Sequence, residues 1–158
     1  MRVRIEPRED GDPNAEDEIV IRCARMDDRA RRLEAAVRQC LSEETGISLF
    51  REDTEFFLPC KEILFFETDG RKVVAHTADD LYYTKEKLFT LEQMLPRAFV
   101  RASKSCIVNA AAVFCIRRSL TGVSEVGFRG TEKTAFLSRS YYKNLMDHLD
   151  ELRRYSHG

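Results

Sequence analysis

A short polar segment in the middle of the chain holds the residues best suited to bind an anion. Ser103-Lys104-Ser105 separates the apolar pairs Phe99-Val100 and Ile107-Val108. A polar break in an apolar frame predicts an exposed bend. There the Lys104 ammonium and the two hydroxyls either reach phosphate oxygens or guanine acceptors, or form a solvated surface. The bend lies in a window from Gln93 to Ser124 without Asp or Glu, in a chain of formal net charge −1. We therefore expect a locally positive surface, built from Arg97, Arg101, Lys104, Arg117 and Arg118.

Two other cationic positions stand where a turn or a helix start would expose them. Arg71 and Lys72 follow Asp69-Gly70, a hairpin signal, so they are expected at a loop tip, either as an anion contact or as solubility groups. Arg139 follows Ser138, which is expected to cap the last helix. A helix N-terminus suits a phosphate, whereas the helix dipole gives no reason to place an arginine there. Binding therefore accounts for Arg139 better than folding does.

Several other residues are expected to have structural roles. Arg101 alternates with Phe99 and should point into the domain and pair with an acid, and the amide of Asn109 should bond the backbone of a turn. Core positions, and not stacking platforms, are expected for Phe65, Phe66, Phe99, Phe114, Phe128 and Phe136.

No motif of an enzyme or a cofactor site is present. The sequence contains no Gly-rich phosphate loop, no Gly-x-Ser-x-Gly and no His-Glu-x-x-His. The five cysteines include no Cys-x-x-Cys pair and mostly lie beside apolar residues, and the three histidines are scattered. We therefore predict mostly buried free thiols, no metal, no cofactor and no enzymatic activity.

The elements that would position the cations follow from periodicity. Residues 1–25 contain two alternating runs, at Val3–Ile5 and Ile19–Cys23, and a helix capped by Asp27 or Asp28 follows. This predicts a β-β-α appendage over residues 1–44, whose arginines form either a solvated face or a regulatory or dimerising contact. After it, strands are expected at 47–50, 55–58, 63–66, 72–77, 82–83, 112–118, 123–128 and 133–137, with a short helix that Thr84 caps and Pro96 ends, and a last helix after Ser138.

The order of these signals resembles the LytTR DNA-binding family of bacterial transcriptional regulators. The resemblance spans about residues 45–150 and rests on three anchors: Ile63–Glu67, Phe99–Asn109 and Leu137–Lys143. It implies a mainly β, elongated β-β-β fold of ten strands with short helices, whose loops enter successive DNA grooves. It also implies that the DNA-binding positions are Arg71, Lys72, Ser103, Lys104, Ser105, Ser138 and Arg139.

The sequence thus predicts a cytoplasmic, sequence-specific regulator of transcription that binds double-stranded DNA at a promoter or operator, as a homodimer or as two copies. The stretch before residue 45 is too short for a receiver domain, which indicates the standalone type of LytTR regulator, and residues 151–158 are expected to be a tail. No signal peptide or membrane insertion is expected. The alternative is a LytTR-like protein-interaction module that regulates a partner without touching DNA, and RNA binding is a more distant one.

Overall fold

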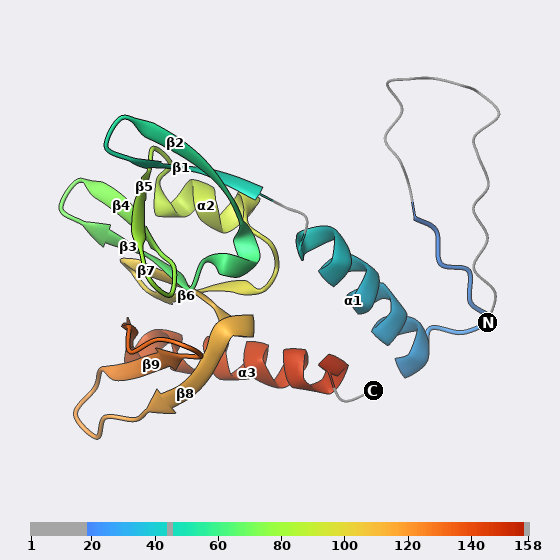
Figure 1. Cartoon of the computed structure of the whole chain (residues 1–158). Coiled ribbons are helices and arrows are strands. Elements are labelled where there is room, and N and C mark those ends of the chain that lie inside the picture. Colours follow the sequence, from blue (N-terminus) through green and yellow to red (C-terminus); the bar gives the residue numbers. More distant parts are fainter. Residues whose placement is uncertain (1–18, 44–45, 157–158) are drawn as a thin grey trace.

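The computed structural model describes residues 19–43 and 46–156, and this part is mainly β-structure with three α-helices (Figure 1). The elements are α1 (Asp28–Glu43), β1 (Gly46–Arg51), β2 (Thr54–Pro59), β3 (Phe65–Asp69), β4 (Lys72–His76), β5 (Leu81–Thr84), α2 (Leu88–Met94), β6 (Phe99–Ser103), β7 (Cys106–Asn109), β8 (Val113–Arg117), β9 (Ser124–Phe128), β10 (Thr134–Leu137) and α3 (Arg139–Ser156). Short 3₁₀ turns lie at Cys60–Glu62 and Ala110–Ala112. Within these described residues, the expectation of ten strands with few helices is confirmed.

The strands form two antiparallel sheets. One has seven strands in the order β2-β1-β5-β4-β3-β7-β6, and the other has three in the order β10-β9-β8. β1 joins the larger sheet through the single pair Phe50 and Tyr83. Hairpins connect β1 to β2, β3 to β4 and β6 to β7, as the turn signals predicted.

Two hydrophobic cores lie on opposite faces of the central strands β3 and β7. Phe65 and Val108 face the core that the small sheet and α3 cover, whereas Phe66 and Ile107 face the core beneath α2 and the β1–β2 hairpin. Each of these four side chains is at most 2% exposed. A strand buried on both faces needs a continuous apolar run, which is what Ile63–Phe66 and Ile107-Val108 supply.

Asn109 closes β7 at the end far from the β6–β7 turn. It is buried, donates its amide Nδ2–H to the carbonyl of Ile63 (2.9 Å) and accepts from the Ala111 backbone N–H (3.1 Å). The expected structural role of Asn109 is therefore confirmed.

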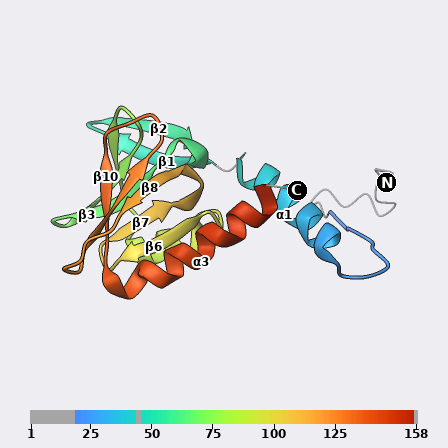
Figure 2. The same cartoon turned by 90° about the horizontal axis from the view of Figure 1, so that it is seen from below.

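The last helix, α3, lies along the outside of the domain and packs on β6 (Figure 2). Leu145 and Leu149 are buried, and Tyr141, Tyr142 and Leu152 pack against the same core, so the predicted helical spacing is confirmed. The helix continues through residue 150 to Ser156.

The N-terminal expectations are only partly met. Asp27 caps α1, because its Oδ1 accepts from the Ala30 N–H at 2.9 Å. The expected strand at Ile19–Cys23 is wrong: this segment is exposed coil and joins neither sheet of the described chain. Alternating apolar and polar residues form a β-ladder only where another strand lies beside them. The strand expected to pair with Ile19–Cys23, at Val3–Ile5, lies outside the described residues.

Three smaller corrections concern single side chains. Thr84 does not cap α2; its hydroxyl accepts from the Glu86 N–H, and the helix begins after Lys87. Phe114 and Phe136 are 63% and 60% exposed, because they lie on the outer face of the small sheet, which no helix or strand of the described residues covers. Of the four cysteines with described side chains, Cys60 and Cys106 are buried, but Cys23 and Cys115 are exposed.

Candidate nucleic-acid interface

The β6–β7 turn presents Lys104 to solvent and is held from behind by Arg101. The Arg101 guanidinium donates through Nη1 to the Lys104 carbonyl (3.2 Å), and its Nε lies 3.3 Å from Glu92 Oε2 on α2. Ser103 Oγ accepts from the Ser105 N–H (3.2 Å), which shapes the turn. The prediction that Arg101 points inward and pairs with an acid is confirmed, and the Lys104 side chain is left exposed.

The β3–β4 turn presents Arg71 and Lys72. Gly70 has φ = 60°, and a glycine at the first central position suits the two-residue hairpin turn between Asp69 and Lys72. Arg71 is exposed, whereas Lys72 places its Nζ 4.9 Å from the centroid of the Tyr83 ring. Lys72 is therefore partly directed onto its own sheet.

These two turns and the start of α3 are neighbours, although they lie far apart in the sequence. The Thr68 N–H donates to the Ser105 carbonyl (2.9 Å), which places the β3–β4 turn beside the β6–β7 turn. The Ser138 N–H donates to the Ala102 carbonyl (2.9 Å), which fixes the start of α3 beside the end of β6. The three predicted segments thus form one continuous surface, here called the turn edge, which comprises Arg71, Lys72, Ser103, Lys104, Ser105, Ser138 and Arg139.

The start of α3 differs in detail from the expected cap. Ser138 precedes the helix, and its carbonyl accepts from the Tyr141 N–H (3.1 Å), but its hydroxyl lies 3.3 Å from the Ser140 hydroxyl. Arg139 is exposed in the first turn.

Ion pairing separates the cations of the acid-free window into two groups. Arg97 pairs with Glu151 (3.0 Å), Arg101 with Glu92 (3.3 Å) and Arg117 with Glu125 (2.8 Å), so acids from outside the window neutralise three of its cations. Lys104 and Arg118, the other two cations of the window, have no carboxylate within 4.0 Å among the described residues, and neither do Arg71 and Arg139 outside the window. The positive surface of the window is therefore narrower than the sequence predicted, because only Lys104, at the turn edge, and Arg118, after β8, stay without an ion pair.

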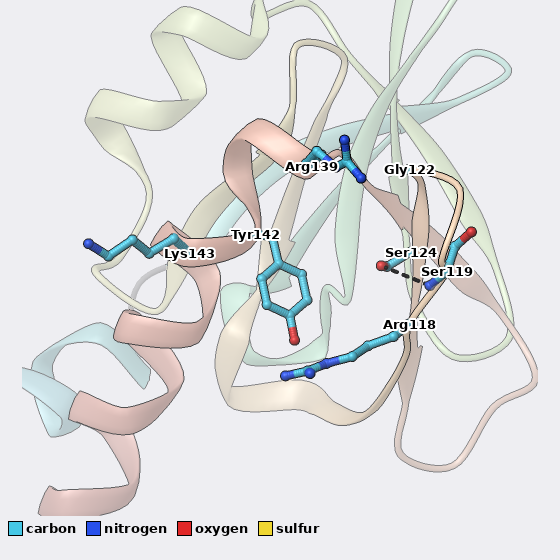
Figure 3. Close-up of a pocket in the computed structure, with 7 residues that line it drawn as sticks. All are labelled: Arg118, Ser119, Gly122, Ser124, Arg139, Tyr142 and Lys143. Atoms are coloured by element: carbon cyan, nitrogen blue, oxygen red, sulfur yellow. Dashed lines mark hydrogen bonds between the residues drawn. The ribbon is translucent and has the colours of Figure 1, made fainter.

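A shallow pocket next to Arg139 contains residues that the sequence analysis did not assign (Figure 3). The β8–β9 connection contributes Arg118, Ser119 and Gly122, the start of β9 contributes Ser124, and α3 contributes Arg139, Tyr142 and Lys143. Two signals were present in the sequence: Arg118 belongs to the acid-free window, and Lys143 ends the third LytTR anchor.

Burial shifts the pKa values of titratable groups inside the domain. Burial raises the pKa of the Cys106 thiol to about 12, so it stays protonated and unreactive. Burial also lowers the pKa of His76, although Glu67 Oε1, 2.8 Å from its Nε2, acts in the opposite direction. No group of three or more metal-ligating side chains exists in the described part of the chain. None of its helices is long and apolar enough to span a membrane.

Fold and surface together define a two-core β-domain that presents unneutralised cations from turns along one edge. The model of the LytTr DNA-binding domain family matches residues 53–150. The chain belongs to this family.

Relatives and a solved structure agree with this assignment. Two Staphylococcus aureus proteins described as uncharacterized HTH-type transcriptional regulators are similar in sequence. The one from strain bovine RF122 / ET3-1 is 26% identical over 134 residues, and the one from strain NCTC 8325 / PS 47 is 25% identical over 131 residues. Each match covers 83% of this chain and 88% of the relative.

The solved structure is the LytTr DNA-binding domain of a methyl-accepting/DNA response regulator from Bacillus cereus. It has a TM-score of 0.61 at 20% identity and covers 67% of this chain and 97% of that domain. The fold predicted from the resemblance is thereby confirmed. Strands separate each helix from the next in the described residues, so the arrangement contains no helix-turn-helix there.

Proposed function

We propose that this protein is a transcriptional regulator that binds duplex DNA sequence-specifically through the turn edge. The observation that carries the proposal is the pair of backbone hydrogen bonds, from Thr68 to Ser105 and from Ser138 to Ala102, that joins three cationic segments into one surface. Membership of the LytTR family and the names of the relatives support DNA as the ligand. Such a regulator works in the cytoplasm, where the DNA is.

The residues of the turn edge suit two kinds of DNA contact. Arg139, at a helix start with free backbone N–H groups, is suited to a phosphate. Lys104 and Arg71, at the tips of adjacent turns, are suited to reach base edges in successive grooves. The edge has no aromatic residue on which an unpaired base would stack, which favours a duplex over a single strand.

The test is the salt dependence of binding to a fluorescent duplex that carries the region upstream of the protein's own gene. We expect Lys104→Ala and Arg139→Ala to weaken binding, and each lost phosphate contact to reduce the salt slope by about one. Lys61→Ala and Arg153→Ala are matched controls. Lys61 is exposed beyond the opposite end of β3, and Arg153 is exposed on α3, about 21 Å from Arg139 along the helix.

Two outcomes would count against the proposal. Unchanged affinity in both turn-edge variants would show that the turn edge is not the DNA-binding site. Absence of binding by the unmodified chain at low salt would favour the alternative, a module that regulates a protein partner. The exposed apolar side chains of Ile19, Val20 and Met26 next to α1 are the observation in favour of that alternative. We also propose that these three residues form the contact between the two chains of a homodimer.

A further inference from the structure

The pocket beside Arg139 is formed by two segments that the fold brings together from different parts of the chain. Residues 118–123 connect β8 to β9, which begins at Ser124, and residues 139–143 form the first turns of α3. The pocket holds about 310 Å³ and is open to solvent. Hydroxyl groups of Ser119, Ser124 and Tyr142 line it together with the cations, and none of its seven lining residues is Asp or Glu.

Arg118 is the cation that distinguishes this pocket from the rest of the small sheet. Its guanidinium carbon lies 5.2 Å from the centroid of the Tyr142 ring, and among the described residues no carboxylate lies within 4.0 Å of it. The adjacent Arg117 instead pairs with Glu125, its cross-strand neighbour, at 2.8 Å. Stacking on an aromatic face orients a guanidinium but leaves its N–H groups free to donate. Arg118 is thus oriented without being neutralised.

The loop that carries Arg118 is held in shape by its own hydroxyls. Ser119 Oγ accepts from the Thr121 N–H (3.2 Å), and the nearly buried Ser124 Oγ accepts from the Ser119 N–H (3.4 Å). Gly122 has φ = 138°, a conformation that residues with side chains rarely adopt. These hydrogen bonds restrain the loop, and Figure 3 shows it beside the start of α3.

The cations occupy different sides of the pocket. In Figure 3, Arg118 extends beneath the Tyr142 ring and Arg139 lies above it near Gly122, while the ammonium of Lys143 points away from both. Each guanidinium presents several N–H donors, so each of the two arginines is suited to the oxygens of a tetrahedral oxyanion. The first turn of α3 adds backbone N–H groups and the positive end of the helix dipole.

We propose that this pocket binds a backbone phosphate of the DNA, so that the β8–β9 connection is a fourth DNA-contacting segment. The inference rests on the proposed function and extends it, because Arg139 belongs to both the turn edge and the pocket. A phosphodiester is linked to a sugar on each side, so a pocket that binds it must be open to solvent, as this pocket is. A free phosphate offers the same chemistry, but the continuity with the turn edge favours the DNA backbone.

The decisive variant is Arg118→Met, which keeps an apolar stem against Tyr142 and removes the charge. We expect it to weaken binding to the upstream duplex and to an unrelated duplex by the same factor, and to reduce the salt slope by about one. Arg118→Lys should recover part of the affinity. Arg117→Met is the matched control and should leave the slope unchanged, since Glu125 already neutralises that charge.

The outcomes separate this inference from the function on which it rests. If Lys104→Ala reduces the salt slope while Arg118→Met does not, the pocket is no DNA contact and the proposed function stands. If the unmodified chain binds no DNA, both fail. A titration of the full chain with inorganic phosphate tests whether free phosphate, and not DNA, is the ligand of the pocket. The titration is followed through the amide resonances of Ser119, Gly122 and Tyr142. Saturation at micromolar phosphate that is lost in Arg118→Met, without an effect of that variant on DNA binding, would assign the pocket to a free anion and overturn the proposal.

Discussion

Arg101 shows how a residue that faces away from solvent can determine what an exposed one does. It joins Glu92 on α2 to the carbonyl of Lys104 and so fixes the β6–β7 turn relative to the domain. Only 16% of its side chain is exposed, so it is not itself available to DNA. We regard it as a positioning residue for Lys104.

Replacing Arg101 by Met should weaken DNA binding without removing a phosphate contact. The turn loses one hydrogen bond, and ordering it again on the DNA should cost about 1 kcal/mol, or roughly a fivefold loss of affinity. The salt slope should stay as in the unmodified chain, in contrast to Lys104→Ala. Fluorescence anisotropy at several salt concentrations measures both quantities, and a reduced slope in Arg101→Met would show that Arg101 contacts the DNA directly.

For single residues, the sequence predicted the structural role of a side chain better than the residue with which it pairs. The inward direction of Arg101 and the backbone bonding of Asn109 followed from local alternation and side-chain chemistry. The acids that neutralise Arg97 and Arg117 are Glu151, on α3, and Glu125, across a strand pair. Such pairs depend on tertiary packing, so the sequence could not predict which cations of the window are neutralised.

Among the elements, the β3–β4 hairpin depends on one glycine. Gly70 adopts a positive φ of 60°, and an added Cβ there would meet no atom within 4 Å, so the cost of a side chain is conformational and not steric. The glycine positions Arg71 at the tip of the turn, beside the β6–β7 turn.

The variant Gly70→Ala should lower the free energy of unfolding by about 1 kcal/mol, because a left-handed conformation is costly for a residue with a Cβ. Gly46→Ala is the control: Gly46 has no positive φ, and its Cβ would lie 3.6 Å from the Leu58 carbonyl, an ordinary contact. Urea unfolding followed by circular dichroism compares the two. Equal stability of the two variants would show that the turn adopts another conformation at no cost.

Elements with a strong local signal were predictable, and elements that need a distant partner were less so. The apolar runs, the Asp-Gly turn and the spacing of Leu145 and Leu149 identified β3, the hairpin and α3. The strand expected at Ile19–Cys23 failed because alternation alone does not create a neighbouring strand. Phe114 and Phe136 were misassigned because an apolar run does not show which face of a sheet is covered.

At the scale of the whole molecule, the sequence supplied the family and the strand content but not the assembly of the sheets. β1 joins β5 through the single pair of Phe50 and Tyr83, and β8, β9 and β10 form a sheet of their own. Both features depend on contacts between residues far apart in the sequence. The LytTR resemblance supplied the three segments that we propose bind DNA, and the two backbone hydrogen bonds that join them became visible only in the fold.

The two cores share β3 and β7, and this arrangement makes unfolding a single cooperative event. Phe65 and Phe66, like Val108 and Ile107, stabilise opposite cores from adjacent positions, so neither core can open while the other stays packed. Amide protons in β3 and β7 should therefore exchange with solvent only through global unfolding, at a free energy equal to that from urea unfolding, whereas those at the tips of the turn edge should exchange much faster. Hydrogen exchange followed by NMR measures this difference. Faster exchange in β7 than in β9 would show that the cores open separately. The stable centre thus keeps the spacing of the turns constant, while the exposed side chains at their tips remain free to adjust to the surface they meet.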